Sequence, residues 1–489
     1  MSAAIGQRFW TRMFMVGSGE NDRRSRVRQH GPMPPRIRAL ALMLLLLAGS
    51  LLAPASSSAV TTTNVAQRYD ITATLDVGAN RLDAVETLTV TNRSARTINY
   101  LNLSVVPRAL GYLSMPDPIT VDGAEVDVRW TTGINLRVSL PNLAPRETAM
   151  LRIPFTLEIG RSPDAFTART SVENGVLSFG QWFPIVSTEH DVYGLGDPQL
   201  SFTADVIRFE LTTTTSLGRN AVACPGLRAA PGTSGTSWTC RSNDVRDFSF
   251  VVNPRFNLTR RTVGDVDLRV YTETVSGAAT ADLAADALVR MSETFGDYPW
   301  PDLVLAEVGS GGGFSMEYPR MIHLTRGKVA DPYVVYHEVA HQWFYGQLGN
   351  DQQREPWLDE AFADFSARWL MGIGENQCST RPVDSEVFAW DAGATTGGDW
   401  TSCNGYFHAV FYRGTEFITA VRSAMGDDAF FSAMRYWVDR YRHGFVTGDR
   451  LLRHLQSRTD ADLAPIYAAY LADPLVPRLR GAPAGVFVQ

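Results

Sequence analysis

A short motif, His-Glu-Val-Ala-His at residues 337–341, constrains the fold of this chain more than any other feature. On an α-helix, residues four positions apart lie on the same face, so His337 and His341 can bind one metal ion together. A carboxylate from elsewhere completes a zinc site whose fourth position stays open to water, and Glu360 is placed to supply it. Glu338 can then take a proton from that water. The motif therefore predicts a hydrolase that uses one zinc ion.

The residues before and within the motif predict the helix that it requires. Asp331 followed by Pro332 is a typical N-cap with a proline at the first helical position. A buried metal-binding helix also needs an apolar side, which is supplied by Val334, Val335, Val339 and Ala340. These features disfavour the alternative that the two histidines only pack or face solvent.

A second predicted helix carries the third ligand. It runs from Leu358 to Met371, is closed by Gly372, and holds Glu360 in its first turns. Asp364 lies one turn beyond Glu360 on the same face. Its carboxylate is predicted to accept the free N–H of a ligating histidine and to hold the tautomer of that ring.

These segments together resemble a known family. The run His-Glu-Val-Ala-His-Gln-Trp-Phe at 337–344, followed by Glu-Pro-Trp-Leu-Asp-Glu-Ala-Phe at 355–362, is similar to the gluzincin metallopeptidases of the aminopeptidase N family. Their short bacterial members are the most similar. The 18 residues between His341 and Glu360 match the family pattern. The likeness extends from about residue 66 to the C-terminus, and the zinc motif is its most specific part.

Two upstream segments add to the resemblance. Ser-Met-Glu-Tyr-Pro at 315–319 resembles the G-x-M-E-N segment of the family, an edge strand that lines the substrate cleft. The resemblance implies that Glu317 binds the free α-amino group of a peptide and so limits cleavage to the first peptide bond. Gln-Trp-Phe-Pro at 181–184 resembles a W-F-P segment near the end of the family's first domain.

The chain departs from the family at two positions. Phe314 stands where the G-x-M-E-N segment begins with glycine, and the run Gly311–Gly313 is expected to allow the close approach of substrate instead. Phe411 stands where the family's Y-x-[KR]-G segment has a tyrosine that stabilises the tetrahedral intermediate. Losing one such donor typically costs roughly 10²–10³ in rate. Either a neighbour such as Tyr412 or Tyr406 replaces it, or the enzyme is slow, or it has lost activity.

The favoured interpretation is a zinc-dependent aminopeptidase that hydrolyses N-terminal residues from peptides or proteins by means of metal-activated water. One alternative is a zinc endopeptidase of thermolysin-like chemistry, in which Glu317 has no amine to bind. Another is a catalytically weakened zinc-binding scaffold, which Phe411 motivates. Neither the side-chain preference nor the oligomeric state follows from the sequence.

The N-terminal region predicts export. Residues 39–53 form an apolar run that is shorter than the ~20 residues needed to span a bilayer, and Ser57-Ser58-Ala59 suits cleavage by signal peptidase. We expect residues 1–59 to be a signal peptide with a long leader, which a start at Met33 in place of Met1 would shorten. The mature protein is then secreted, periplasmic or at the cell surface, with no stable membrane span. An uncleaved signal anchor is the alternative.

Four cysteines follow the predicted signal peptide. Their spacing favours the pairs Cys224–Cys240 and Cys378–Cys403, although three connectivities are possible. None lies beside the two histidines of the zinc motif, so disulfides in an oxidising compartment are preferred to metal ligands. Free buried thiols are the alternative.

The chain is predicted to divide near residue 258 into an N-terminal β domain, 60–258, and a catalytic domain, 259–489. In the first domain, apolar and polar residues alternate in strand-like segments at 69–75, 86–90, 151–159 and 208–213. Turn residues separate these segments. They predict a β-sandwich or saddle.

The second domain is predicted to be mainly helical. Helices are expected at 279–295, 407–425 and 429–441, and a strand pair, 303–308 and 317–324, should flank the glycine run. The whole is predicted to be an α+β multidomain protein, and the resemblance implies that its second part is thermolysin-like. The net charge of −6 is mild and the basic clusters lie in the leader, so no nucleic-acid binding is predicted.

Overall fold

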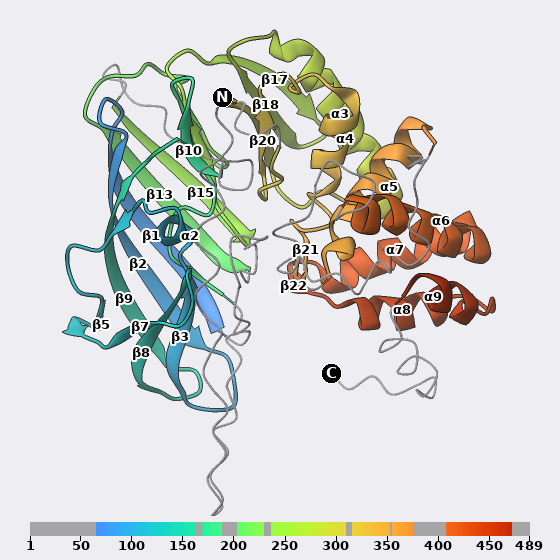
Figure 1. Ribbon diagram of the computed structural model, residues 1–489, viewed down its shortest axis with the longest axis horizontal. Coiled ribbons are helices and arrows are strands. Elements are labelled where there is room, and N and C mark those ends of the chain that lie inside the picture. The colour runs from blue at the N-terminus through green and yellow to red at the C-terminus, as the bar shows by residue number, and fades with distance from the viewer. Residues whose placement is uncertain are drawn as a thin grey trace, which may run out of the picture. The chain divides into compact units, whose positions relative to one another are not determined.

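A large twisted sheet forms the N-terminal part of the folded chain in the computed structural model (Figure 1). Its main path of strands is β15 (Ser237–Val245), β13 (Ala204–Thr213), β1 (Val65–Asp76), β2 (Arg81–Asn92), β9 (Thr148–Glu158), β5 (Thr120–Val121) and β6 (Ala124–Glu125), with β4 (Leu113–Ser114) pairing β9. All pairs are antiparallel except β1 with β13. Buried and more exposed residues alternate along β1 and β2, as the sequence pattern predicted.

The structure describes residues 65–161, 169–187, 203–228, 236–309, 315–352, 355–374 and 407–471. All of these residues belong to one compact unit. Several predictions fall outside the described residues, namely those on the signal peptide, the glycine run with Phe314, Tyr406 and the pair Cys378–Cys403. No helix in the described ranges is both long and apolar enough to cross a bilayer.

Two smaller sheets accompany the large one. One has the order β12 (Ile185–Val186), β3 (Ile98–Ser104), β8 (Asn135–Leu143) and β7 (Val128–Trp130), and the short helix α2 (Val106–Ala109) follows β3. The other has the order β10 (Thr170–Glu173), β11 (Val176–Phe179), β16 (Phe250–Val252) and β14 (Val222–Ala223). Together with the large sheet they confirm the predicted β-rich first part.

Trp182, from the Gln-Trp-Phe-Pro segment, lies at the centre of the aromatic core of this part. Its side chain is fully buried and its indole N–H donates to the carbonyl of Phe248 at 3.0 Å. The ring meets residues from several strands edge-on, with centroid distances of 5.2–6.2 Å to Phe179, Phe209 and Phe250. Such a buried aromatic cluster joins the sheets through both apolar area and ring geometry.

The predicted disulfide between Cys224 and Cys240 is confirmed. Cys224 follows β14 and Cys240 lies in β15, so the bond links the large sheet to one of the smaller ones. Both residues are fully buried.

A further four-stranded sheet packs against the helices that include the zinc motif. Its order is β17 (Asn257–Val263), β18 (Val266–Thr272), β19 (Asp302–Val308) and β20 (Met321–Thr325), with β18, β19 and β20 parallel. The helix α3 (Gly277–Phe295) packs on β17 and β18 and also on α4 (Pro332–Ala340). The predicted boundary between 258 and 259 falls inside β17, and the division into domains stays a prediction.

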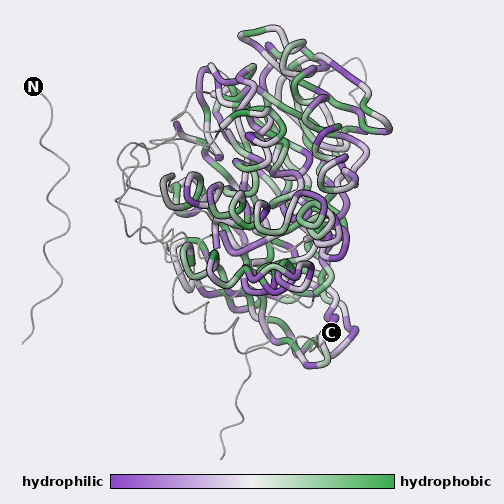
Figure 2. The backbone as a smooth tube through the Cα atoms, turned by 90° about the vertical axis from the view of Figure 1, so that its right-hand side faces the viewer, coloured by the Kyte–Doolittle hydropathy of each residue, from purple (hydrophilic) through white to green (hydrophobic). Residues whose placement is uncertain are grey.

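The remaining described elements are mostly helices. They are α5 (Glu360–Met371), preceded by the 3₁₀ turn η2 (Pro356–Leu358), then α6 (Arg413–Met425), α7 (Asp427–Tyr441), α8 (Gly448–Gln456) and α9 (Ala464–Tyr470). The short strands β21 (Leu348–Gly349) and β22 (Gly444–Phe445) pair in parallel. Hydrophobic and hydrophilic residues alternate along these helices (Figure 2), as expected of helices with one buried face.

The predicted helix at 407–425 begins as a π-helical segment, η4 (Phe407–Tyr412), and becomes regular only in α6.

The predicted strand over 317–324 is wrong in its first half. The chain turns back on itself, so that Met316 bridges His323 in antiparallel fashion and the Met321 N–H donates to the Tyr318 carbonyl. Pro319 has no N–H for a strand ladder, and Arg320 adopts a left-handed backbone with φ of 65°. The regular strand β20 therefore begins only at Met321.

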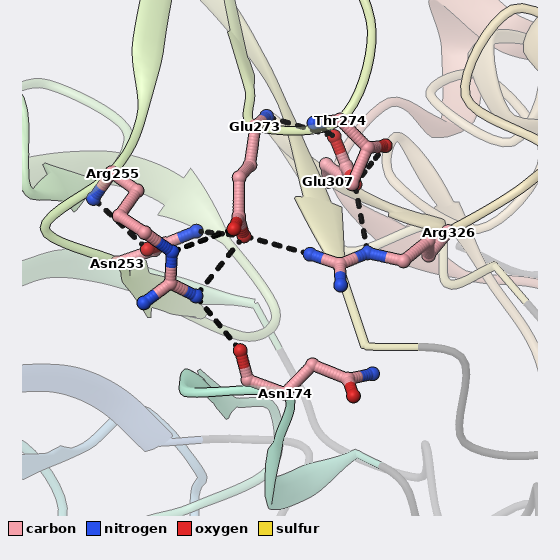
Figure 3. A network of polar contacts seen from close by, with 7 residues as sticks. All are labelled: Asn174, Asn253, Arg255, Glu273, Thr274, Glu307 and Arg326. Atoms are coloured by element: carbon pink, nitrogen blue, oxygen red, sulfur yellow. Dashed lines mark hydrogen bonds and ion pairs between the residues drawn. The ribbon is translucent and has the colours of Figure 1, made fainter.

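A polar network fastens the hairpin β10–β11 to the sheet of β17 to β20 (Figure 3). Arg255 donates to the Asn174 carbonyl at the hairpin turn and to the Glu273 carboxylate, at 2.8 and 2.6 Å. Arg326 donates to Glu273 and to the buried Glu307, at 2.7 and 3.0 Å. The two arginines thus share one carboxylate, which lowers the pKa of Glu273 to about 2, chiefly through the hydrogen bond from Arg255.

Candidate active site

The helix α4 begins where the sequence predicted. The Asp331 carboxylate accepts from the N–H groups of Tyr333 and Val334, at 3.1 and 3.4 Å, and Pro332 is the first helical residue. This cap satisfies N–H groups that the first turn leaves without intrahelical partners. The helix ends at Ala340, with His341 as its C-cap, so both motif histidines stay one turn apart.

Three side chains converge at this end of α4. Nε2 of His337 lies 3.0 Å from Nε2 of His341, and one Glu360 oxygen lies 3.2 and 3.3 Å from these two nitrogens. His341 is 1% exposed and His337 8%. Two imidazole nitrogens and a carboxylate oxygen thus meet at one point inside the protein.

The donor set fits zinc. A tetrahedral zinc ion with ligands at 2.0–2.1 Å holds neighbouring ligand atoms about 3.3 Å apart, and the observed separations are 3.0–3.3 Å. Burial alone would raise the pKa of Glu360, but the neighbouring His341 and His337 lower it to about 2. The carboxylate is therefore ionised, as a metal ligand must be.

Glu338 lies beside this cluster with a buried carboxylate. Its Oε2 has no hydrogen-bond partner among the described residues. Burial raises the pKa of Glu338 well above its ordinary value, and the nearby carboxylates of Glu317, Glu360 and Asp359 raise it further, although His341 opposes them. A carboxylate with a raised pKa and no fixed donor suits a group that must accept a proton during a reaction.

Asp359, which the sequence reasoning missed, is the partner of a motif histidine. Its Oδ1 lies 2.5 Å from Nδ1 of His341, and its other oxygen accepts from the Gln352 side chain. If the helix began at Leu358, as predicted, Asp359 would point away from the histidines. In the structure the 3₁₀ turn ends at Leu358 and α5 starts at Glu360, so that Asp359 and Glu360 both face His341.

The predicted role of Asp364 is wrong. Its carboxylate accepts from the Tyr333 hydroxyl, from Thr415 Oγ1 at 2.7 Å and from Arg368 Nε at 2.9 Å. These bonds join α5 to α4 and α6, and neither motif histidine is among the partners. Although Asp364 lies only one helical turn beyond Glu360, its carboxylate does not reach the point where the two histidines meet.

Glu317 lies next to the cluster, in the folded-back segment before β20. It is 4% exposed, and its carboxylate, a ring nitrogen of His341 and an oxygen of Asp359 all lie within 4.8 Å of one another. Glu317, which the resemblance named, thus lies near His341, and its role in binding substrate stays a prediction.

Phe411 packs directly on a predicted ligand. Its ring stacks nearly parallel to the His337 ring, with centroids 5.7 Å apart and an angle of 15°. The position that carries tyrosine in the related family therefore lies at the cluster, but the side chain here has no hydroxyl. Tyr333 also lies near His337, at 5.9 Å between ring centroids, yet its hydroxyl donates to Asp364.

Comparisons with known proteins agree with this site. Residues 323–470 match the model of the peptidase family M1 domain. The aminopeptidase N of Lactobacillus helveticus is 27% identical over 167 residues, which are 29% of this chain and 19% of that protein. That of Lactobacillus delbrueckii subsp. lactis is 26% identical over 157 residues, with the same coverage. The match thus spans about a fifth of the length of these relatives.

The fold of this chain is similar to that of solved structures over most of its length. An M1 zinc metallopeptidase from Deinococcus radiodurans has a TM-score of 0.58 at 19% identity, covering 86% of this chain and 93% of that one. Yeast LTA4 hydrolase in complex with bestatin has a TM-score of 0.60 at 14% identity, with 87% and 71% covered. The predicted α+β class is confirmed, and the match of residues 323–470 to the peptidase family M1 domain confirms the resemblance to the gluzincins.

Proposed function

We propose that the protein is a zinc-dependent aminopeptidase that removes N-terminal residues from peptides or proteins. The observation that carries this proposal is the convergence of His337, His341 and Glu360, with separations of 3.0–3.3 Å, beside two further buried carboxylates. The matched relatives named aminopeptidase N support it. So does a two-domain M1 zinc metallopeptidase solved with L-arginine, which is 20% identical with a TM-score of 0.57, covering 85% of this chain and 93% of that one.

His337, His341 and Glu360 would hold the zinc ion, which when bound supplies a Lewis acid for the scissile carbonyl and for the attacking water. Asp359 prepares His341 for this role. By accepting the Nδ1 proton it leaves the Nε2 lone pair directed toward the other two ligands. Phe411 packs against His337 and restricts the orientation of that ring.

Glu338 is the proposed general base. Its free carboxylate oxygen takes the proton of the attacking water and then delivers it to the leaving amine. The raised pKa of Glu338 favours the first transfer, because a stronger base accepts the proton more readily.

Glu317 is the proposed anchor for the substrate N-terminus. A buried carboxylate binds an ammonium group through charge-assisted hydrogen bonds, and this carboxylate lies within 4.8 Å of a ring nitrogen of His341. This geometry supports an exopeptidase.

Phe411 supports a second candidate, a zinc-binding protein with weak or no turnover. It stands at the sequence position where the related family has a tyrosine, and its ring stacks on His337 without a hydroxyl. The complete set of metal-binding and acidic residues around it favours the aminopeptidase instead.

We also propose that the protein works outside the cytoplasm after cleavage of residues 1–59. The Cys224–Cys240 disulfide supports an oxidising compartment. Sequencing of the N-terminus of the mature protein tests this proposal, because intact residues before Val60 would contradict cleavage.

The test of the proposed activity compares matched substrates. Purified zinc-loaded protein is assayed with aminoacyl chromogenic amides and with the same amides carrying an N-acetyl group, with and without a chelator. Chelator-sensitive hydrolysis of the free amides alone supports the aminopeptidase. Equal hydrolysis of the blocked amides indicates an endopeptidase, and no hydrolysis of either indicates the scaffold.

A further inference from the structure

Gln342 follows the second motif histidine and connects the metal-binding helix to the segment that carries Glu317. We propose that Gln342 is a positioning residue for Glu317: its side-chain amide fixes the backbone of residues 317–320 and so sets where the carboxylate meets the substrate ammonium. This inference rests on the proposed function, since it concerns how that site recognises a free N-terminus.

The contacts of Gln342 are directed at one short stretch of backbone. Its Oε1 accepts from the N–H of Arg320 at 2.7 Å. Its Nε2 donates to the carbonyls of Glu317 and Tyr318, at 3.3 and 3.2 Å. Gln342 is fully buried, so water does not compete for these groups. A single amide thereby satisfies three backbone groups of the folded-back segment.

The segment needs such support because its backbone is strained. Arg320 has a φ of 65°, which non-glycine residues adopt only at a cost and retain only where their surroundings hold them. The N–H of this residue is bound by Gln342, while its Nε donates to Asp302 at 2.8 Å. The main chain of Arg320 is therefore held by Gln342, next to the zinc motif, and its side chain is held by Asp302 of β19.

Packing limits the segment from the other direction. Tyr318 is fully buried, and its ring lies so close to Gly180 that a methyl group there would be 1.9 Å from the tyrosine hydroxyl oxygen. Residue 318 thus has little freedom to move toward the N-terminal β part. On the other side, Gln342 binds the carbonyls of Glu317 and Tyr318 and so restrains the same backbone.

Removing the amide would release the backbone that presents Glu317. The carboxylate would then lose its fixed place near His341, and misplacement by about 1 Å can cost about a hundredfold in an enzyme. The loss should fall on recognition of the ammonium group, because Gln342 contacts the 317–320 backbone through its side chain while His341 binds the metal through its own ring.

The test measures binding, so that it does not depend on turnover. A fluorescently labelled tripeptide with a free N-terminus and its N-acetylated form are titrated into zinc-loaded protein carrying Glu338→Gln. Gln342→Met, which has similar shape and no hydrogen-bonding amide, is added in this background, alone and with Glu317→Gln. Gln342→Glu, which keeps an acceptor for the Arg320 N–H, serves if the methionine variant fails to fold.

We expect Gln342→Met to lower the preference for the free N-terminus by tenfold or more, with zinc content unchanged, and to have no added effect once Glu317 is Gln. The matched control is Tyr467→Phe, which removes a buried hydrogen bond to the Leu452 carbonyl far along the chain and should keep the preference. The inference is overturned if Gln342→Met retains the preference, if it weakens both peptides equally, or if its effect persists without the Glu317 carboxylate. Absence of any preference in the parent protein overturns it too, whereas the proposed function fails separately if wild-type protein hydrolyses no aminoacyl amide.

Discussion

Asp359 Oδ1 lies 2.5 Å from Nδ1 of His341, and both side chains are completely or almost completely buried. This contact fixes the orientation of the His341 ring, as its proposed role as a zinc ligand requires. Burial alone would lower the pKa of His341, but Asp359 and Glu360 raise it well above its ordinary value. This carboxylate sets the ring orientation that the metal site needs.

Asp359→Asn should therefore weaken zinc binding about 10–100-fold, because a carboxylate behind a ligating histidine fixes its tautomer and raises its basicity. Competition with a chromophoric chelator measures the zinc affinity. Asp364→Asn is the matched control. It removes a buried charge on the same helix whose partners are Tyr333, Thr415 and Arg368, so it should lower thermal stability and leave zinc affinity unchanged. Equal loss of zinc affinity in both variants would contradict the assignment.

Phe411→Tyr should raise kcat for aminoacyl amides by about tenfold or more, because it adds a hydrogen-bond donor beside His337 and an oxyanion donor is worth roughly 10²–10³ in rate. Tyr412→Phe should leave kcat unchanged, since the neighbouring position on the helix points elsewhere. Steady-state kinetics at equal zinc content checks both. A rate unchanged by Phe411→Tyr, together with a large loss in Tyr412→Phe, would show that Tyr412 already supplies the donor.

Asp302→Asn should destabilise the fold by about 3–5 kcal/mol. Asp302 accepts from the buried guanidinium groups of Arg269 and Arg320 and from the Gly226 N–H. Neutralising it leaves Arg320 with no ion-pair partner among the described residues, and leaves Arg269 only the more exposed Asp267, 3.4 Å from its Nε. Urea denaturation gives the free energy of unfolding. As a control, Asp282→Asn breaks an exposed pair with Arg261 and should cost less than about 1 kcal/mol. Similar losses for both would refute the argument from burial.

Glu86→Gln should stabilise the protein at neutral pH and not in acid. Glu86 is fully buried, neither carboxylate oxygen has a partner in the part of the chain that the structure describes, and burial raises its pKa well above the ordinary value. Below the unfolded pKa, near 4.5, the acid is neutral in both states and the variant gains little. As the pH rises, only the unfolded chain ionises, and wild type loses about 1.4 kcal/mol per pH unit until the folded pKa is reached.

Denaturation of wild type and Glu86→Gln at pH 4, 5.5 and 7 tests this sign. The difference in unfolding free energy should grow with pH in favour of the variant. A difference that is constant, or that shrinks as the pH rises, would mean that Glu86 is ionised in the folded state.

The sequence predicted what local patterns determine. The period of two in β1 and β2 and the Asp331–Pro332 cap of α4 depend on neighbouring residues, and both elements formed where expected. The turn at Arg320 and the start of α5 at Glu360 depend on contacts with distant residues such as Gln342 and His341. For that reason the strand at 317–324 and the role of Asp364 were mispredicted, and Asp359 was missed.

The polar network of Figure 3 likewise depends on contacts between residues that are distant in the sequence. Arg255, Glu273 and Arg326 come from separate strand ends, and only the folded sheet brings them together around the turn at Asn174. No spacing in the sequence marks such a set, since the carboxylate and its two cations are far apart along the chain. Motifs reveal residues that share a helix, whereas networks between elements require the fold.

The most direct test of the central claim compares wild type with Glu338→Gln at equal zinc content on an aminoacyl chromogenic amide. The isosteric change keeps the size of the buried side chain and removes its ability to take a proton. If Glu338 is the general base of a zinc aminopeptidase, kcat/KM should fall by about 10²–10⁴ while one zinc ion per chain is retained. Hydrolysis that continues at the wild-type rate in the zinc-loaded variant would contradict the account.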